Sequence, residues 1–546
     1  MSVQEKIRQR FPDTVYKPLV HPERHLGFNY TGFHPGKTQK LPRGHVRSPG
    51  SQAFPVDVTW EQDRAIPMRD GIKLYADIFR PANEHEKVPA ILPWGPYGKV
   101  GTSTLNYDNM GPWHIGLPYQ NLSGYETFEL SHFDLDWKGP NPAEWCSRGY
   151  AIIDVDARGS GNSEGALMFW GEQLNFAARF NHPNLKAIAP WEGLTDPYGQ
   201  QSCRGGIPRL GFADLIVQAF AGRGNAEYLS AMVKSRPLYD DYWDEKRIRP
   251  ENIRDIPMYL TASYSTGLHC EGSFQTFERA QTARKWLRVH ASQEWHDLYR
   301  PEATDDMQRF YDFYAKGIQN GWEDDTPRVR LSLLGYDGSY SGTVVERAEK
   351  QWPPVRQQTR RYYLDENSSL TRTKPSTPSQ VAHEGHSLSD SSDFIVYFDR
   401  CTEVCGRPFV KLYMSCDAAD DFDVLVQIRK ISSSRELLKS LNWFSMPKPG
   451  PERQSDYDDE VPQYGHKSRQ PIPPGAVVSL LIPIWPVGMV FEARESLMLR
   501  ISGHDMALPE AEALRLTSPV DENRGRHTVY TGGEHESYIV IPAITN

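Results

Sequence analysis

Short continuous apolar runs, separated by turn residues, recur between residues 55 and 195 and point to strands. Pro89–Pro93 and Tyr150–Asp156 are two such runs, and runs of this kind are typical of strands that a sheet buries on both faces. Apolar and polar residues alternate in Ile72–Phe79 directly after an Asp70-Gly71 pair, a pattern that predicts a β-hairpin. We therefore expect an α/β core with a hairpin at its edge.

The pattern changes after this core and then returns to it. Leu174–Phe180 predicts a helix and Leu185–Ala189 a further strand, whereas residues 196–255 are charged, aromatic and rich in helix formers. We interpret residues 196–255 as an inserted helical segment. The core pattern resumes over residues 256–350, with a strand at Ile256–Ala262, a helix from about Glu271 to Arg284 and a strand at Lys285–His290.

Helical signals fade beyond Trp352-Pro353-Pro354, and alternating runs take over to the end of the chain. Many short strands between Gly and Pro turns favour a β-sandwich of jelly-roll type over residues 351–546. Residues 1–54 are rich in His, Pro, Gly and Arg without a sustained period, and we expect an N-terminal extension lying on the surface of the core. The alternating runs are Phe394–Phe398, Phe409–Met414, Phe422–Ile428 and Leu497–Ile501.

Charge and hydropathy narrow the classes of partner. The 61 Lys and Arg residues and the 70 Asp and Glu residues give a net charge of −9 without a basic stripe, which argues against nucleic acid and against a membrane surface. The longest apolar run, Val477–Phe491, contains two prolines and is shorter than the roughly 20 residues that span a bilayer. The N-terminus has charges where a signal peptide needs its apolar region. We expect a soluble, cytoplasmic protein that acts on a neutral or small organic substrate rather than on a polyanion.

Six cysteines are too few for a disulfide framework in 546 residues. Cys401 and Cys405 have no second pair at the spacing of a metal site. The cysteines therefore predict no cysteine-bound metal site, and they permit a reducing compartment.

One G-x-S-x-G string, Gly161–Gly165, is present. A nucleophile elbow requires a strand, a tight turn with the serine and a helix directly behind it. Four residues of loop, Ala157–Ser160, separate the strand Tyr150–Asp156 from Gly161, and no helical stripe follows Ser163. We interpret Ser163 as a loop residue rather than the nucleophile.

Four segments carry a resemblance to a known family: Met68–Leu74, Pro93–Lys99, Arg148–Gly165 and Ile188–Gly193. With them, the chain from about residue 55 to its end resembles the cocaine esterase and X-Pro dipeptidyl-peptidase (CocE/NonD) group of serine hydrolases. The resemblance implies an α/β-hydrolase core, an inserted helical cap and a C-terminal jelly-roll domain. It also implies a Ser, Asp, His triad that acts without a cofactor on a small ester, an amide or a short X-Pro peptide.

The segment in which the family carries its serine is too short in this chain. Family members place a G-x-S-[YW] elbow between segments like Phe169–Gln173 and Ala187–Trp191, which are joined here only by Leu174–Lys186. These are thirteen residues, whereas a βαβ unit needs about 30. Two explanations remain open: a mis-drawn or alternatively spliced reading frame, which we favour, and a divergent paralogue. Either way, loss of a central strand puts folding itself in question.

The other residues of the implied triad are present to different degrees. His296, after the strand Lys285–His290, matches the family's histidine, the general base; the alternative is a surface histidine beside Asp297. His290 and His269 are interpreted as structural. The family's aspartate position holds Thr266 here, and Glu271, one turn further on, is the candidate acid; the alternative is that it complements the helix dipole.

Two further residues complete the candidate site. Ser265 is a second candidate nucleophile because Ser263–Gly267 approximates an elbow after a strand, although its position matches the family's acid. Tyr97 matches the family's oxyanion donor, while a buried tyrosine with an ordinary hydrogen-bond partner is the alternative. Two functions therefore remain open: a serine hydrolase of impaired activity, and a non-catalytic remnant or binding protein. The sequence does not decide whether the chain forms a homo-oligomer.

Overall fold

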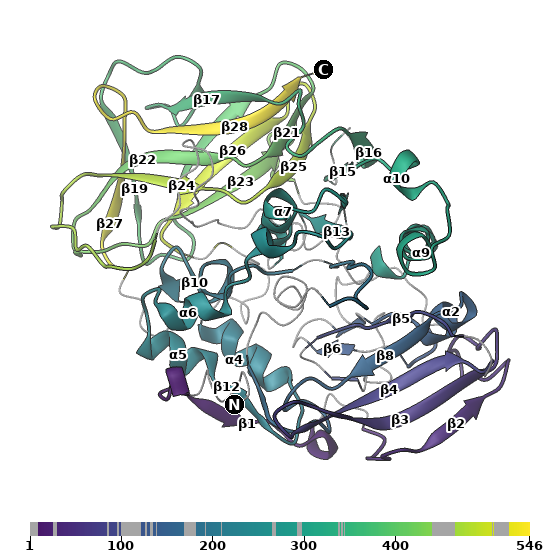
Figure 1. Ribbon diagram of the computed structural model, residues 1–546. Helices are drawn as coiled ribbons and strands as arrows, with labels where there is room; N and C mark the ends of the chain where they lie inside the picture. Colours follow the sequence, from purple (N-terminus) through teal and green to yellow (C-terminus); the bar gives the residue numbers. More distant parts are fainter. Residues whose placement is uncertain are drawn as a thin grey trace. The chain divides into compact units, whose positions relative to one another are not determined.

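The chain contains two compact units, each built from several segments (Figure 1). The first comprises residues 1–187, 212–235 and 294–325, and the second comprises residues 188–211, 236–293 and 326–546. The computed structural model describes residues 9–25, 30–83, 87–95, 98–99, 122–125, 128–130, 135–137, 139–168, 182–191, 193–208, 210–264, 269–291, 297–336, 339, 342, 344–438, 465–504, 506 and 523–545.

The first unit contains the predicted hairpin, but strands pair with it on both sides in a five-stranded sheet, so it does not lie at the edge as predicted. Its turn needs a positive φ, which Gly71 supplies at +86°. The strand order is β2 (Thr38–Leu41), β3 (Val58–Pro67), β4 (Lys73–Pro81), β8 (Ala151–Val155) and β5 (Ala90–Ile91). Two strands border the hairpin, β2 antiparallel to β3 and β8 antiparallel to β4, and β5 adds parallel to β8.

Side-chain hydrogen bonds define the start of one helix of this unit and attach another to the residue before β8. The helix α2 (Pro142–Ser147) begins at Asn141, whose side chain accepts the Ala143 N–H. Tyr150, directly before β8, donates its hydroxyl to Asp312 of α9 (Pro301–Ala315) at 2.6 Å. The unit also contains α5 (Leu229–Ser235), α10 (Trp322–Asp325), the pair β6 (Phe128–Leu130) and β7 (Leu135–Trp137), and the small sheet of β1 (Tyr16–Pro18), β12 (Asn225–Glu227) and β9 (Ala166–Leu167).

The N-terminal extension is therefore integrated into this unit. β1 pairs with β12, and β2 pairs with β3. Leu41 and Phe54 are buried. The extension contributes an edge strand to each of two sheets.

The predicted helical insertion is helical in part and falls into both compact units. Its helices are α4 (Leu210–Ala219), α5, α6 (Asp241–Lys246), the π-helix η4 (Tyr198–Ser202) and the 3₁₀ turn η5 (Pro250–Asn252). The short strands β10 (Cys203–Arg204), β11 (Ile207–Pro208) and β12 interrupt it. Sequence patterns gave no signal for strands of two or three residues, because such strands are too short to show alternation.

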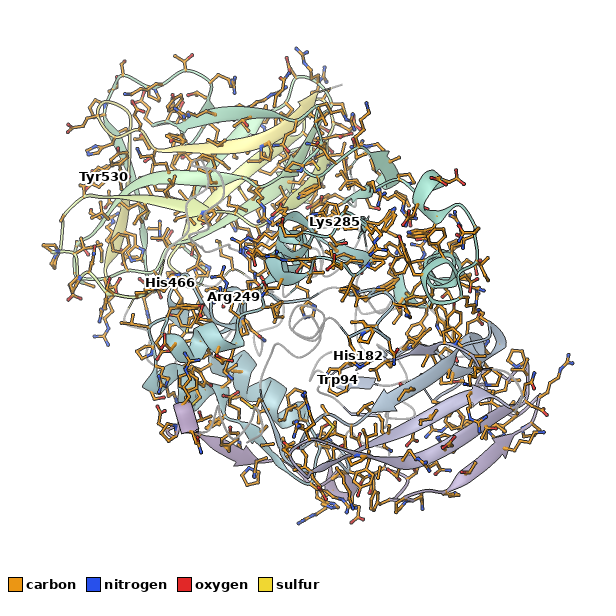
Figure 2. All side chains as sticks on the ribbon, viewed as in Figure 1. Trp94, His182, Arg249, Lys285, His466 and Tyr530 are labelled. Carbon is orange, nitrogen blue, oxygen red and sulfur yellow. The ribbon has the colours of Figure 1, made fainter. Side chains whose placement is uncertain are left out.

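The second unit contains the remaining parallel strands. Strands β13 (Met258–Ser263), β14 (Lys285–His290) and β15 (Val329–Leu333) are parallel, and β16 (Val344–Glu349) adds antiparallel. The helix α7 (Cys270–Arg279) joins β13 to β14 and ends earlier than predicted. The reason is Lys285, whose ammonium binds the carbonyls of Phe277 and Ala280 at 2.7 Å each (labelled in Figure 2).

The C-terminal part of this unit is a sandwich of two sheets. In β22, Val410, Leu412 and Met414 are buried while Lys411 and Tyr413 between them are only partly buried, as predicted for one face packed on a core. The larger sheet contains β17 (Gln358–Leu364), β18 (Leu370–Thr371), β19 (Ser379–Glu384), β21 (Thr402–Gly406), β22 (Phe409–Cys416), β24 (Val478–Pro483), β25 (Val487–Phe491), β27 (Arg526–Thr531) and β28 (Tyr538–Thr545). The smaller sheet contains β20 (Ser392–Tyr397), β26 (Ser496–Ser502) and β23 (Leu425–Ile431).

The parallel pair β5 and β8 and the parallel strands β13 to β15 thus belong to separate sheets, and the short parallel pair β9 and β12 belongs to a third. β5, only two residues long, is the last strand of the first sheet. The predicted strand Leu185–Ala189 is reduced to isolated parallel bridges of Ile188 and Trp191 to β13. Among the described residues, no ladder joins β5 to this segment. The predicted helix Leu174–Phe180 lies outside the described residues.

Candidate functional site

Three of the four predicted site residues, Tyr97, Ser265 and His296, lie outside the described residues. So does the junction at Gln173 and Leu174. The roles of these residues remain predictions, and the structure shows the elements that flank them.

Ser163 is a structural loop residue, as predicted. Its side chain is fully buried. The Oγ donates to the Asp156 carbonyl at 2.7 Å and accepts the Tyr75 N–H at 2.9 Å. The hydroxyl therefore ties the loop after β8 to the neighbouring strand β4.

The same loop encloses the buried carboxylate of Asp156. The two oxygens of this carboxylate accept the backbone N–H groups of Lys99 and Asn162, each at 2.8 Å. A Cβ at Gly161 would lie 2.2 Å from the carboxylate, and the backbone φ there is +50°. The Gly-rich string is thus explained by the need to pass close to Asp156.

Lys99 is the centre of a buried charge cluster, which we call the Lys99 cluster (Lys99, Asp63, Asp77, Asp156). Its ammonium lies 2.9 Å from Asp63 Oδ1 and 2.7 Å from Asp77 Oδ1. Burial alone would lower the pKa of Lys99, but the three carboxylates raise it above its ordinary value. Burial raises the pKa of Asp156 to about 6, although Lys99 acts in the opposite direction. The ammonium is therefore held charged inside the protein.

This cluster fixes one flank of the segment that contains Tyr97. Lys99 follows two residues later, and its side chain and its N–H are both bound. On the other flank, Trp94 (labelled in Figure 2) packs against the buried residues Leu74 and Ala76. Both flanks are attached to strands of the first sheet.

In the second unit, the end of β13 and the start of α7 surround the predicted acid. Ser263 ends β13 opposite His290 of β14, and both are buried. Tyr264 stacks on Phe274 of α7, with ring centroids 5.4 Å apart. Burial at a strand end agrees with the interpretation of His290 as structural.

Glu271 lies in the first turn of α7 and has two side-chain partners. Its Oε2 lies 2.5 Å from Arg407 Nη1, and its Oε1 accepts from Gln275 Nε2 at 2.6 Å. Both oxygens are thus engaged by groups other than a histidine. These contacts favour a stabilising role over that of a triad acid, which stays a prediction.

Sequence reasoning missed the Lys99 cluster and Arg407. Asp77 and Asp156 stand in or directly after apolar strand runs, and a charged residue within such a run is a usable signal for a buried ion pair. Arg407 had no such signal, since its partners are more than 120 residues away in sequence.

Among the residues that the structure describes, no group of three His, Cys, Asp or Glu side chains could hold a metal ion. Within those residues, no helix is long and apolar enough to cross a membrane.

Two family profiles match the chain. Residues 70–177 match the X-Pro dipeptidyl-peptidase (S15 family) and residues 320–540 match the X-Pro dipeptidyl-peptidase C-terminal non-catalytic domain. A curated relative, the L-tyrosine:2-oxoglutarate aminotransferase ucdG of Aspergillus ustus, is 35% identical over 103 residues. These are 19% of this chain and 17% of that protein, so the chain spans only a small part of its length.

Solved structures match over nearly the whole chain. A CocE/NonD family hydrolase from Staphylococcus aureus is similar with a TM-score of 0.76 and 26% identity, over 90% of this chain and 94% of that one. An α-amino acid ester hydrolase has a TM-score of 0.61 at 15% identity, over 91% and 98%, which shows a common fold. The predicted α/β-hydrolase core with a C-terminal β-rich domain is confirmed. The chain belongs to the cocaine esterase and X-Pro dipeptidyl-peptidase-like (CocE/NonD) family of hydrolases.

Proposed function

We propose that this chain is a serine hydrolase family member for ester or amide acyl substrates, X-Pro dipeptides among them, whose activity is impaired because the segment with its nucleophile is absent. The observation that carries this proposal is the length of the segment in which the family carries its serine. A nucleophile elbow stands at the end of a central strand, and the thirteen residues Leu174–Lys186 are too few to supply strand, elbow and helix.

The roles of the remaining residues follow from acyl-transfer chemistry. In a complete member, the serine hydroxyl attacks the acyl carbon while the imidazole, His296 here, accepts its proton and returns it to the leaving group. Tyr97 would donate a hydrogen bond to the oxyanion. Without the serine, these two residues have no attacking group to serve.

The cytoplasmic location, the absence of a cofactor and the small-molecule or short-peptide substrate belong to the same proposal. They rest on the charge balance, the sparse cysteines and the family membership. The alternative function, a non-catalytic remnant or binding protein, rests on the same short segment.

Labelling with a fluorophosphonate tests the catalytic claim. The purified chain is incubated with the probe beside an active serine hydrolase and beside heat-denatured chain, and any adduct is mapped by mass spectrometry. We expect no adduct. An adduct on Ser265 or Ser163 would mean that the chain contains its own nucleophile, and the proposal would be wrong.

Sequencing the transcript across the Gln173–Leu174 junction tests the origin of the gap. An in-frame segment with a G-x-S-Y or G-x-S-W turn would identify the missing piece. In the chain completed with that segment, His296→Ala should abolish labelling and Tyr97→Phe should lower kcat by about 10²- to 10³-fold. A transcript that reads directly from Gln173 to Leu174 would instead favour a divergent paralogue.

A further inference from the structure

The C-terminal sandwich contacts both ends of the connection between β13 and α7. Tyr264, the residue after β13, lies so close to Gly488 of β25 that a Cβ there would be 2.1 Å from its ring. Its hydroxyl is 3.9 Å from the Cys405 sulfur in β21. At the other end, the thiol of Cys270, the first residue of α7, points to the carbonyl of Pro486 at 3.6 Å.

Arg407, between β21 and β22, binds the helix itself. Its Nη1 lies 2.5 Å from Glu271 Oε2 and its Nη2 lies 3.0 Å from Glu278 Oε2. The other oxygen of Glu278 accepts the Trp352 Nε1–H at 3.0 Å. Burial alone would lower the pKa of Arg407, but the two carboxylates raise it, so the guanidinium remains charged in place.

The spacing of the two glutamates explains how one guanidinium can bind both carboxylates. Glu271 and Glu278 are seven residues apart, which places them two turns apart on one face of α7. A planar guanidinium that binds both carboxylates restricts the rotation of the helix about its axis as well as its position. A lysine, with a single ammonium, would not span both carboxylates in the same way.

We propose that Arg407 is a positioning residue, through which the C-terminal domain holds α7 and the end of β13 in place. This is the position at which the family resemblance puts the acid of the triad, now Thr266, so the catalytic meaning of the proposal rests on the proposed function. The domain that the family profile describes as non-catalytic thereby holds the end of β13 and the start of α7 in the hydrolase core.

Hydrogen exchange of the full chain, followed by mass spectrometry, tests this role. Arg407→Gln should accelerate exchange in α7 by about tenfold while β22 and β26 exchange as before. Arg407→Lys should give a smaller acceleration. The matched control is Arg500→Gln, which removes an equally bidentate pair to Asp393, at 2.8 and 2.7 Å, and should leave α7 unchanged.

Two results would overturn the proposal: unchanged exchange in α7, or acceleration spread evenly over β22 and β26, which would indicate general destabilisation. If Arg407→Gln does not fold, Glu278→Gln takes its place, because it leaves the Glu271 pair intact and should loosen the last turn of α7 first. Exchange needs no nucleophile. A fluorophosphonate adduct would therefore refute the proposed function without affecting the exchange result. Unchanged exchange in α7 would refute the role of Arg407 without affecting the proposed function.

Discussion

At the scale of single residues, buried charges rather than catalytic groups account for the most distinctive sequence string. The G-x-S-x-G pattern exists because Asp156 needs a close, Cβ-free approach and because Ser163 bridges two backbone strands. This G-x-S-x-G string therefore serves the packing around the Lys99 cluster.

Ser163→Ala should lower the free energy of unfolding by about 1–3 kcal/mol, because the buried Tyr75 N–H and Asp156 carbonyl lose their partner. Denaturant titration measures this change. Ser147→Ala, at an exposed hydroxyl, is the control and should change little. If Ser163→Ala left stability intact but removed a fluorophosphonate adduct, the structural role would be wrong.

Lys99→Met should lower the free energy of unfolding by more, about 3–5 kcal/mol, because the three buried carboxylates of the Lys99 cluster would lose the cation of that cluster. The matched control is Lys40→Met, whose partner Asp57 is exposed, and little change is expected there. Thermal unfolding of both variants provides the comparison. Equal shifts in the two variants would contradict the importance of burial.

At the scale of elements, the sequence predicted those parts that depend on periodicity. The β3–β4 hairpin and four strands of the sandwich, β20, β22, β23 and β26, follow from alternation and turn residues. The end of α7 was placed too late because the terminating contact comes from Lys285, outside the helix pattern. In the candidate site, the partners of Glu271 could not be predicted, since Arg407 is remote in sequence.

Two buried histidines on neighbouring strands predict that the stability of the sandwich depends on pH. His383 in β19 and His527 in β27 are both buried, with ring centroids 5.3 Å apart. Ser392 binds Nδ1 of His383 at 2.9 Å. Within the described residues, the ring nitrogens of His527 have no hydrogen-bond partner. Phe422 packs on the His527 ring.

Burial lowers the pKa of both histidines to about 4. At His383, Asp390 and Asp393 raise the pKa while His504 lowers it further. At His527, His383 lowers the pKa further while Asp417 raises it. Below pH 6.5 the unfolded chain binds protons that the folded chain does not. The stability of the sandwich should therefore be complete above about pH 6.5 and fall as the pH drops towards 4, by up to roughly 3 kcal/mol per histidine.

Denaturant titrations between pH 7.5 and 4.5, read out by exchange in β19 and β27, measure this slope. His527→Leu should reduce it, and His386→Gln, at an exposed position, should leave it unchanged. A slope that His527→Leu does not alter would assign the pH dependence to other groups.

At the scale of the whole molecule, we expect the cooperativity of unfolding to depend on how the parallel strands are divided between sheets. A parallel sheet transmits stability from strand to strand through its ladders, and edge strands lack this support on one side. Here β5 and the Ile188–Trp191 segment are both such edges among the described residues. Each compact unit therefore depends on its own core.

We expect the chain to unfold in two steps, with one step for each compact unit. Exchange measured at increasing urea should show β4 and β8 opening at a different denaturant concentration from β14 and β22, because no described ladder couples them. If the segment proposed to be missing after Gln173 supplies a strand that pairs with both β5 and the Ile188–Trp191 segment, the two transitions should merge in a chain completed with it. A single transition in the chain as it stands would show that the two sheets are already coupled, and the structural argument for an absent central strand would fail.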